Sequence, residues 1–385
     1  MRFVLVIGIV SLFADTTYEG ARSVVGPYLG ILGASGTVVG FVGGFGELVG
    51  YSVRIVSGTL SDRTGRYWTI TFIGYGINLF AVPVLALAGS WPIAALLIIL
   101  ERFGKGIRTP ARDAMLSHAT AEMGHGKGFG IHEAMDQIGA MLGPIIVSIV
   151  LFLHGGYREG FALLLVPAIL AVSVLIVARH FYPRPRDLEP VLGRATAGGF
   201  PKAFWVYLAG VACLAAGFAD FALVSYHFGQ SSVVAPDLIP IFYAVAMGVD
   251  ALAALILGRI FDRKGVAVLA AVAVVSSLFA PLVFLGGFSL ALAGTILWGI
   301  GLGAQESVMS AAVAAMISRD RRGTAFGTFH TGYGIFWFAG SAVMGVLYDV
   351  SIPALVVFSV VAQLISIPFL LWTAGLLRYP SADAL

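Results

Sequence analysis

Three ionisable residues stand at helical spacing inside an apolar stretch near the amino terminus: Asp15, Glu19 and Arg22. On a helix, residues three and four apart share one face, so the three side chains would point the same way. Ionisable groups in apolar spans are costly and are functional candidates by default. A carboxylate removed from water retains a proton more readily, which makes Asp15 a candidate for reversible proton binding or for contact with a cationic molecule. The alternative is a structural Glu19–Arg22 ion pair within the helix.

A second group of ionisable residues lies in the string GIHEAMDQIG, which carries His132, Glu133 and Asp136. His132 and Asp136 are four residues apart and share one face of a helix. Arg102 falls at a similar depth in its own apolar stretch and could compete with a proton for such a carboxylate. Protonation would then release the arginine and permit a rearrangement. A purely structural pairing of Arg102 with Glu101 or Asp136 is the alternative.

The string HEAMD also resembles part of a zinc-protease motif, in which two histidines one helical turn apart bind the metal. Asp136 replaces the second histidine, which disfavours an intramembrane metalloprotease. Imidazole and carboxylate groups do suit transition-metal ions, so a metal pathway stays open. Its candidate ligands are His132, Glu133, His227 and His330. Further candidates for proton coupling or substrate contact, each inside an apolar stretch, are Asp220, Asp250, Glu306 and His330.

The composition says which kind of element must position these residues. Of 385 residues, 59% are hydrophobic and only 11% are charged, against roughly 25% charged in a typical soluble protein. The mean hydropathy is +0.95. These values exclude a soluble enzyme and a nucleic-acid-binding module, because neither could cover its surface with so few polar groups. They indicate a polytopic membrane protein, and the single cysteine, Cys213, excludes an internal disulfide.

The apolar runs are continuous and long enough for membrane-spanning helices, and we expect an all-α protein with twelve of them. The connections alternate in charge, and the basic ones, such as those with Arg63 and Arg263, should be cytoplasmic. Both termini would then be cytoplasmic, in a multi-pass protein of the cell (inner) membrane. The predicted spans are 3–30, 37–58, 67–89, 92–114, 127–153, 160–180, 203–228, 238–259, 266–286, 289–317, 323–349 and 352–377.

Short sequence motifs recur in the two halves of the chain. GTLSDRTG at 58–65 and GRIFDRKG at 258–265 share Gly, Asp, Arg and Gly in register, and Phe-Ala-Asp recurs at 13–15 and 218–220. The stretch 181–202 is rich in Pro, Gly and Arg, as a linker would be. We therefore predict two pseudo-symmetric six-helix bundles, 1–180 and 203–385, with a cytoplasmic linker between them. Internal repeats of this kind mark secondary transporters.

The loop after the second span resembles the signature loop of the major facilitator superfamily, Gly-x-x-x-Asp-Arg-x-Gly-Arg. It is carried here by Gly58, Asp62, Arg63, Gly65 and Arg66. The resemblance implies the family's twelve-helix fold and a gating role for this loop, in which the aspartate contacts a helix of the other half and stabilises the outward-facing state. The second copy of the loop, with Asp262 and Arg263, would act with it. A turn with a topology-setting basic cluster is the alternative.

Two further motifs resemble the same family. ERFGKGIR is similar to the Arg-x-x-Gln-Gly motif of its fourth helix, with Arg102 in the arginine position and Lys105 in place of the glutamine. GAMLGP is similar to the Gly-x-x-x-Gly-Pro motif of drug–proton antiporters, carried by Gly139, Gly143 and Pro144. The resemblance to the family's helix 4 arginine implies a proton-coupling role for Arg102.

Together these features predict a secondary active transporter that works by alternating access. We expect proton-coupled export of a small amphipathic or cationic molecule by a monomer that needs no cofactor and binds no nucleic acid. Export of a transition-metal ion or metal chelate is the alternative within transport. A non-transporting membrane receptor or an intramembrane metalloprotease is the alternative of another class.

Overall fold

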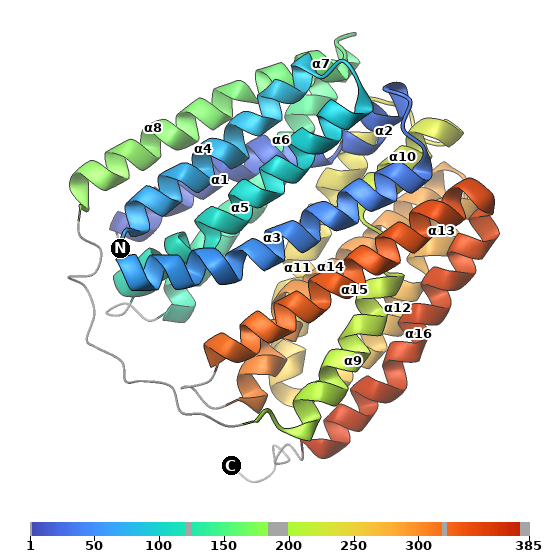
Figure 1. The fold of residues 1–385 in the computed structure, drawn as a ribbon. Helices are drawn as coiled ribbons and strands as arrows, with labels where there is room; N and C mark the ends of the chain where they lie inside the picture. Colours follow the sequence, from blue (N-terminus) through green and yellow to red (C-terminus); the bar gives the residue numbers. More distant parts are fainter. Residues whose placement is uncertain (1, 121–124, 184–198, 318–321, 378–385) are drawn as a thin grey trace. The chain divides into compact units, whose positions relative to one another are not determined.

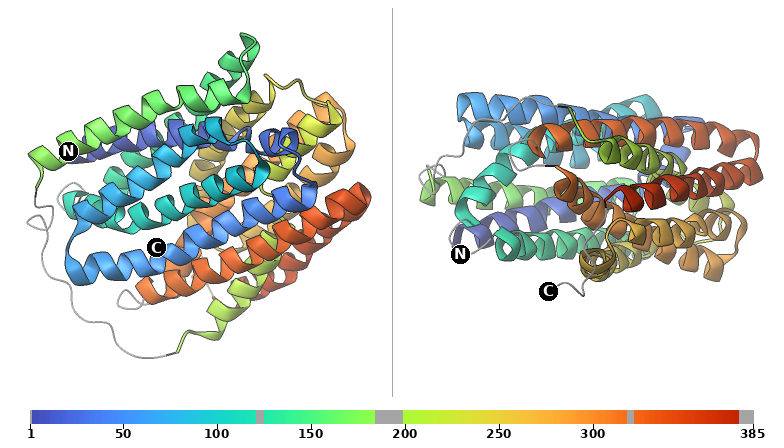
Figure 2. Two further views of the ribbon diagram at one scale, coloured as in Figure 1. Left: turned by 45° about the horizontal axis from the view of Figure 1, so that its top comes forward. Right: turned by 90° about the horizontal axis from the view of Figure 1, so that it is seen from below.

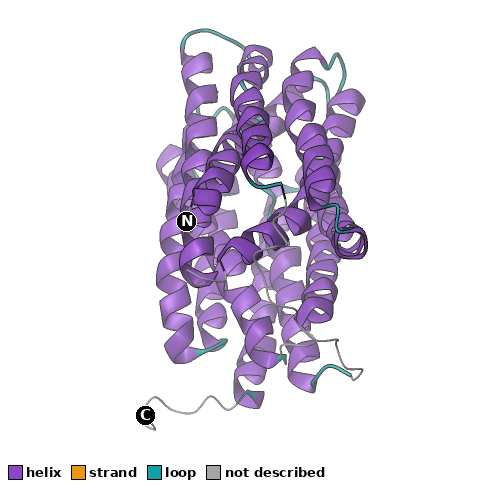
Figure 3. Ribbon diagram, turned by 90° about the vertical axis from the view of Figure 1, so that its left-hand side faces the viewer, coloured by secondary structure: helices purple, strands orange, loops and turns teal. Residues whose placement is uncertain are grey.

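The computed structural model describes residues 2–120, 125–183, 199–317 and 322–377, apart from the side chains of 118–130 and 318–324. Figure 3 shows that this part of the chain consists of helices joined by short loops, with no strand in the residues described. The predicted linker 181–202 falls mostly outside the described residues. The all-helical fold expected from the continuous apolar runs is confirmed.

Eleven helices in the described residues are long and apolar enough to cross a membrane. The remaining predicted span, 92–114, lies in the 30-residue helix α5 (Trp91–Thr120). This helix carries four ionisable residues between positions 101 and 108. The remaining helices are α1 (Arg2–Arg22), α2 (Val25–Ile31), α3 (Gly36–Thr64), α4 (Tyr67–Val84), η1 (Leu85–Leu87), α6 (His125–Phe152), α7 (Tyr157–Leu163), α8 (Leu165–Phe181), α9 (Lys202–Gly217), α10 (Phe221–Ser231), α11 (Ile239–Lys264), α12 (Ala267–Ser277), α13 (Phe279–Leu285), α14 (Phe288–Met316), α15 (Arg322–Val350) and α16 (Ile352–Leu376).

The helices α3 and α11 continue past the predicted ends of their spans, residues 58 and 259, to Thr64 and Lys264. Apolar patterning stops where the chain leaves the membrane, but polar residues continue a helix equally well. Both helices end in the same way, because Gly65 (φ 66°) and Gly265 (φ 63°) adopt the left-handed conformation that glycine permits. The two signature loops therefore share the left-handed glycine that ends the helix, whereas the residues that follow differ, with ψ 49° at Arg66 and −21° at Val266.

Some predicted spans are interrupted. Between α9 and α10 the helix breaks at 218–220, and the broken ends are satisfied: Asp220 Oδ1 accepts from the Ala222 amide at 2.9 Å, and Trp298 Nε1 donates to the Ala219 carbonyl at 2.8 Å. Such partners are necessary because free backbone groups are costly inside a membrane. The matching Phe-Ala-Asp at 13–15 lies in the uninterrupted helix α1, so the two copies differ in conformation.

The chain forms two compact units. Unit 1 comprises residues 1–35, 45–191 and 225–244, and unit 2 comprises 36–44, 192–224 and 245–385. The division into bundles 1–180 and 203–385 stays a prediction.

Unit 1 is built around α1, which packs against α6 and α8, while α4 packs against α5 (Figures 1 and 2). Apolar side chains such as Phe3, Ile7 and Trp68 form its core between α1, α4 and α8. In unit 2, α9 packs against α15 and α16, and α12 packs against α14 and α16. Asp15, Glu19 and Asp136 thus lie on two helices, α1 and α6, that pack against each other.

Candidate functional site

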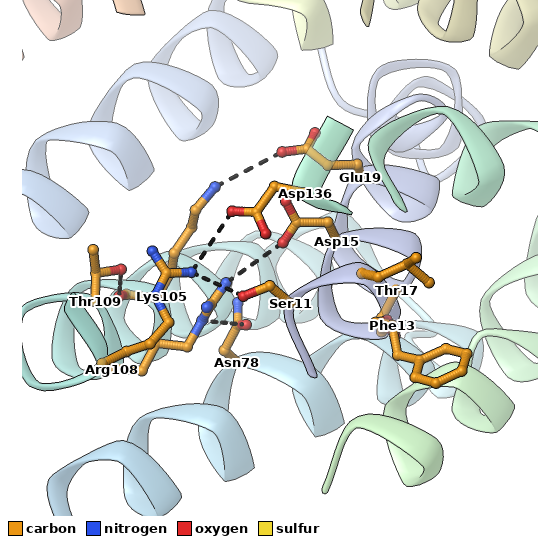
Figure 4. A network of polar contacts seen from close by, with 12 residues as sticks. Ser11, Phe13, Asp15, Thr17, Glu19, Asn78, Lys105, Arg108, Thr109 and Asp136 are labelled. Atoms are coloured by element: carbon orange, nitrogen blue, oxygen red, sulfur yellow. Dashed lines mark hydrogen bonds and ion pairs between the residues drawn. The ribbon is translucent and has the colours of Figure 1, made fainter. Parts of the chain in front are cut away.

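An antiparallel ladder of polar side chains joins α1 and α5 within unit 1. Along α1, toward its C-terminus, the polar residues of the ladder are spaced by about one helical turn. The residues of α5 that face them, taken toward its N-terminus, have the same spacing. We call the following set the α1–α5 ladder: Ser11, Asp15, Glu19 and Arg22 of α1, and Arg112, Arg108, Lys105 and Arg102 of α5. Figure 4 shows most of these side chains from close by.

The first two rungs lie at the Ser11 end of the ladder. Arg112 Nη1 donates to Ser11 Oγ at 3.2 Å, and Arg108 Nη2 lies 3.9 Å from Asp15 Oδ1 (Figure 4). The Arg108 side chain is only 1% exposed and that of Asp15 is 8% exposed. A charge pair at this separation is an ion pair without a hydrogen bond, so neither charged group is fully satisfied by the other.

The third rung joins Lys105 and Glu19, with Nζ 3.7 Å from Oε1 (Figure 4). The other oxygen of Glu19 accepts a short hydrogen bond from the Tyr243 hydroxyl. The Lys105 ammonium also lies 4.1 Å from the centre of the Tyr18 ring. The predicted Glu19–Arg22 pair is present at 3.9 Å, but it is one of several contacts that Glu19 makes.

The fourth rung joins two cations through a shared carboxylate. Glu47 of α3 lies 3.1 Å from Arg22 Nη2 and 3.5 Å from Arg102 Nε. Arg102 Nε is also 3.3 Å from Glu101 Oε2. One of the two sequence alternatives for Arg102, pairing with Glu101, is therefore present in the structure.

A buried amide of α4 braces the middle of the ladder. Asn78 Nδ2 donates to Glu101 Oε1 at 2.7 Å, and Asn78 Oδ1 accepts from Arg108 Nε at 3.2 Å. The Arg108 guanidinium lies 4.5 Å from the centre of the Tyr75 ring. Cations are stabilised over aromatic faces, and more strongly where water is excluded.

Asp136 of α6 meets the Ser11 end of the ladder. Its Oδ2 lies 3.8 Å from Arg112 Nη1 and 3.7 Å from His132 Nε2. Asp136 also lies next to Asp15, close enough for their charges to interact (Figure 4). The ladder thus brings together two of the carboxylates predicted from the sequence, with an arginine facing each.

Glycines of α6 allow this approach. A Cβ at Gly139 would lie 3.0 Å from Asp15 Cβ and would overlap the Leu12 carbonyl oxygen. A Cβ at Gly143 would overlap the Thr16 carbonyl oxygen in the same way. Pro144 follows within α6. The predicted motif of α6 therefore faces α1 beside Asp15, and its role in transport stays a prediction.

The other predicted site residues stand apart from the ladder. Glu133 is exposed on α6, where its Oε1 accepts a 3.4 Å hydrogen bond from Gln137 Nε2. Four belong to unit 2: Asp220, Asp250, Glu306 and His330. Of these, Asp220 caps α10, Asp250 is buried beside Gly303, and Glu306 is exposed. The His330 ring lies beside Phe326 and Phe329.

Within the described residues, no three His, Cys, Asp or Glu side chains gather in a way that could hold a metal ion. Of the predicted metal ligands, His132 approaches Asp136 and Ser11, whereas Glu133 is exposed. His227 is buried in unit 1 and His330 belongs to unit 2.

The signature-loop charges lie at the ends of α3 and α11. Asp62, Arg63, Arg66, Asp262 and Arg263 are all exposed. Asp62 Oδ1 accepts from the Tyr67 hydroxyl at 3.4 Å. A Cβ at Gly58 would meet only Pro110 of α5, at 3.5 Å. The gating contact of Asp62 with a helix of the other half stays a prediction.

Several residues of the ladder and its direct partners are absent from the site predicted from the sequence: Ser11, Glu47, Asn78, Lys105, Arg108, Arg112 and Tyr243. One signal could have found the three missed basic residues of α5, since Lys105, Arg108 and Arg112 follow Arg102 at intervals of three, three and four residues. That spacing puts them on one helical face. No comparable signal links Tyr243 to Glu19, because they are 224 residues apart.

Residues 5–288 match the family described as the Major Facilitator Superfamily. An uncharacterized protein of Mycobacterium tuberculosis is 41% identical over 373 residues, covering 95% of this chain and 91% of the relative. An uncharacterized MFS-type transporter of Methanocaldococcus jannaschii is 26% identical over 314 residues, covering 77% and 76%. The chain belongs to the major facilitator superfamily and is a multi-pass membrane transporter.

Solved structures show the same fold. The nucleoside transporter NupG superposes with a TM-score of 0.71 at 15% identity, covering 99% of this chain and 100% of that one. A POT family transporter in complex with a thioalcohol-conjugated peptide superposes with a TM-score of 0.76 at 13% identity, covering 98% and 97%. At these identities the likeness concerns the fold alone, so the drug–proton antiporter branch is still only a resemblance.

Proposed function

We propose that the protein is a proton-coupled secondary active transporter working by alternating access, in which Asp15 and Asp136 bind the protons. The observation that carries this proposal is a pair of neighbouring carboxylates, with Asp15 buried and Asp136 half-buried, each facing an arginine at 3.8–3.9 Å (Figure 4). Asp15 Oδ1 and Asp136 Oδ1 are buried without a hydrogen-bond partner among the described residues. Each carboxylate therefore has an oxygen that is poorly satisfied when charged.

A proton on either carboxylate changes the ladder in a defined way. It removes the repulsion between Asp15 and Asp136 and weakens the attraction to Arg108 or Arg112. The arginines, which stay charged, are then free to take other partners. Since Asp15 lies on α1, Arg108 on α5 and Asp136 on α6, this exchange changes the contacts among three helices. At the other end of the ladder, Arg102 competes with protons for the carboxylates of Glu47 and Glu101.

The two signature loops provide the proposed gate. Asp62, Arg63 and Arg66 lie at the end of α3, and Asp262 and Arg263 occupy the equivalent place on α11. Basic loops of this kind are cytoplasmic in most membrane proteins. We place both termini in the cytoplasm and the protein in the cell (inner) membrane, as a monomer.

The direction of transport depends on whether cargo and proton exclude each other. A cationic cargo would compete with protons for Asp15 and Asp136, and an inward proton gradient would then drive its export. Export is also the direction that the sequence favours. The Gly139–Gly143–Pro144 segment supports this reading through its likeness to drug–proton antiporters. A metal-ion cargo gains no support, because the described residues hold no metal-ligand cluster. Carriers of nucleosides and peptides with the same fold make a small organic cargo reasonable.

A flux assay tests proton coupling. The purified protein is reconstituted in liposomes that contain a pH-sensitive dye, and a panel of nucleosides, dipeptides, organic acids and amines is added in turn. We expect at least one solute to elicit a proton flux that Asp15→Asn and Asp136→Asn reduce about tenfold or more. Asp237→Asn is the matched control, because Asp237 lies in unit 1 and contributes only its backbone carbonyl, to Ser148. Unchanged flux in both ladder variants would refute the assignment.

A further inference from the structure

The distribution of charge in the ladder is asymmetric between helices. Together with their direct partners, the ladder residues include six buried or half-buried acids, which come from α1, α3, α5 and α6: Asp15, Glu19, Glu47, Glu101, Asp113 and Asp136. The five bases come mainly from α5: Arg22, Arg102, Lys105, Arg108 and Arg112. The set carries one net negative charge when all are ionised. Each proton that an acid accepts makes the set more positive by one charge, and four of the five bases are on one face of one helix.

The ends of the ladder are tighter than its middle. Arg22 donates to Glu47 at 3.1 Å, and Arg112 lies 2.8 Å from Asp113. By contrast, Arg108 is 3.9 Å from Asp15, and Lys105 is 3.7 Å from Glu19. Arg108 Nη1 is buried without a hydrogen-bond partner in the described part of the chain. A buried guanidinium N–H without a partner is costly, so the rung of Arg108 and Asp15 holds an unmet donor group.

Aromatic rings fix the two middle cations independently of the acids. The Tyr18 ring centre lies 4.1 Å from Lys105 Nζ and 5.5 Å from Arg108 Cζ, and the Tyr75 ring faces Arg108 from 4.5 Å. Asn78 also holds Arg108 Nε. The two cations therefore keep their positions when Asp15 or Glu19 is neutralised. Lys105 is the most open cation of the ladder, with 22% of its side chain exposed.

We infer that the cargo carries an anionic group, a carboxylate or a phosphate ester, which binds to Lys105 and Arg108 in the middle of the ladder. This inference rests on the proposed function, because a proton on Asp15 removes the negative charge that faces Arg108. A protonated Asp15 then donates a hydrogen bond to the anion instead of repelling it. Ammonium and guanidinium groups with free donors match the oxygens of either anion.

A cationic cargo fits the same site poorly. Each acid of the middle rungs already faces a base, so a cation would have to displace Arg108 or Lys105 and then remain beside it. Like charges at such a distance in a medium of low dielectric repel strongly. An anion beside Arg108 meets no such charge at Asp15 once Asp15 is protonated. Anion and protons consequently bind together, which makes the coupling a symport and reverses the direction expected for cation exchange.

The test combines binding and flux on the full chain. Binding is measured as the thermal shift of the purified protein with matched solutes that share one carbon skeleton: benzoate, phenyl phosphate, benzyl alcohol and benzylamine, extended to metabolite-sized acids with their amides and amines. We expect only anionic members to stabilise the protein, and more at pH 5.5 than at pH 7.5. Comparing carboxylates with phosphate esters identifies which of the two anions is preferred.

Variants of the middle rung locate the site. Lys105→Gln should weaken anion affinity by about tenfold to a hundredfold, the loss expected for one charge-assisted contact. Lys105→Arg keeps the charge and should retain affinity within about threefold, which separates loss of charge from loss of folding. Lys202→Gln, at the start of α9 beside Trp372, is the control and should bind normally.

The outcomes separate this inference from the proposed function. Anions that bind in the thermal assay but elicit no proton flux would support the anion site and overturn proton coupling. Proton flux elicited by amines and lost in Asp15→Asn would support proton coupling and overturn the anion site. Stabilisation by anions that is equal in wild type and Lys105→Gln would also overturn it, as would a panel in which no anion binds.

Discussion

At the scale of single residues, Glu47 illustrates how buried charges depend on one another. Its carboxylate is shared between Arg22 and Arg102, at 3.1 and 3.5 Å. Two guanidinium groups held this close would repel in a low-dielectric environment without the acid between them. Removing one partner of a buried ion pair leaves an unsatisfied charge, which costs far more than the intact pair contributes. Glu47 is therefore the residue on which the Arg22 end of the ladder depends.

Neutralising Glu47 should lower the stability of the protein. We expect Glu47→Gln to reduce the free energy of unfolding by about 3 kcal/mol, the usual cost of breaking a buried pair. The readout is the thermal unfolding temperature in detergent. Adding Arg22→Met to Glu47→Gln should recover part of the loss, because the repulsion between the two arginines disappears with it. Asp237→Asn should leave the unfolding temperature unchanged, and a drop as large as that of Glu47→Gln would argue against the electrostatic explanation.

At the scale of helices, the approach of α6 to α1 decides where Asp136 lies. Backbone atoms of Gly143 contact Gly20 and Thr16 so closely that a Cβ could not be accommodated. Small residues permit such approach in membranes, where packing and not the hydrophobic effect drives association. The motif of α6 thus sets the distance between α1 and the carboxylate that α6 carries.

A methyl group at Gly143 should separate the two helices. We expect Gly143→Ala to lower the unfolding temperature and to impair proton-coupled flux, because the overlap involves rigid backbone atoms of α1. Gly76→Ala of α4 is the matched control, since its Cβ would meet nothing within 4 Å. That control should be neutral or slightly stabilising, as alanine favours a helix over glycine by about 1 kcal/mol. Equal behaviour of the two variants would contradict the packing role.

The sequence predicted the helices far better than the ladder. Apolar runs located the eleven helices of the described residues that are long and apolar enough to cross a membrane, because the membrane imposes length and composition on each segment separately. The four bases of α5 are also visible as one face. Which acid each base meets depends on how neighbouring helices are aligned, and no spacing within one helix contains that information. Asp136 illustrates this limit: the sequence offers it as a partner for Arg102, whereas in the structure it faces Arg112.

At the scale of the whole molecule, two long helices contribute to both compact units. Residues 36–44 of α3 belong to unit 2 and the rest of α3 belongs to unit 1, whereas α11 begins in unit 1 and continues in unit 2. Within unit 2, α15 holds the first turn of α3: Asp349 accepts hydrogen bonds from the amides of Gly36 and Thr37, both at 2.8 Å, and from Thr37 Oγ1 at 2.6 Å. If the units move relative to each other during alternating access, this cap must open or α3 must bend.

Loss of the contact between Asp349 and the first turn of α3 should therefore favour an opened state, in which this turn has separated from α15. A carboxylate on a helix N-terminus contributes about 1 kcal/mol, so Asp349→Ala should raise the population of the opened state about fivefold. The readout is the rate at which an impermeant maleimide labels a cysteine introduced by Val39→Cys in a Cys213→Ser background, because Val39 is fully buried. Thr37→Val removes only one of the three hydrogen bonds and should give a smaller increase. A labelling rate that neither substitution changes would mean that this contact does not limit opening.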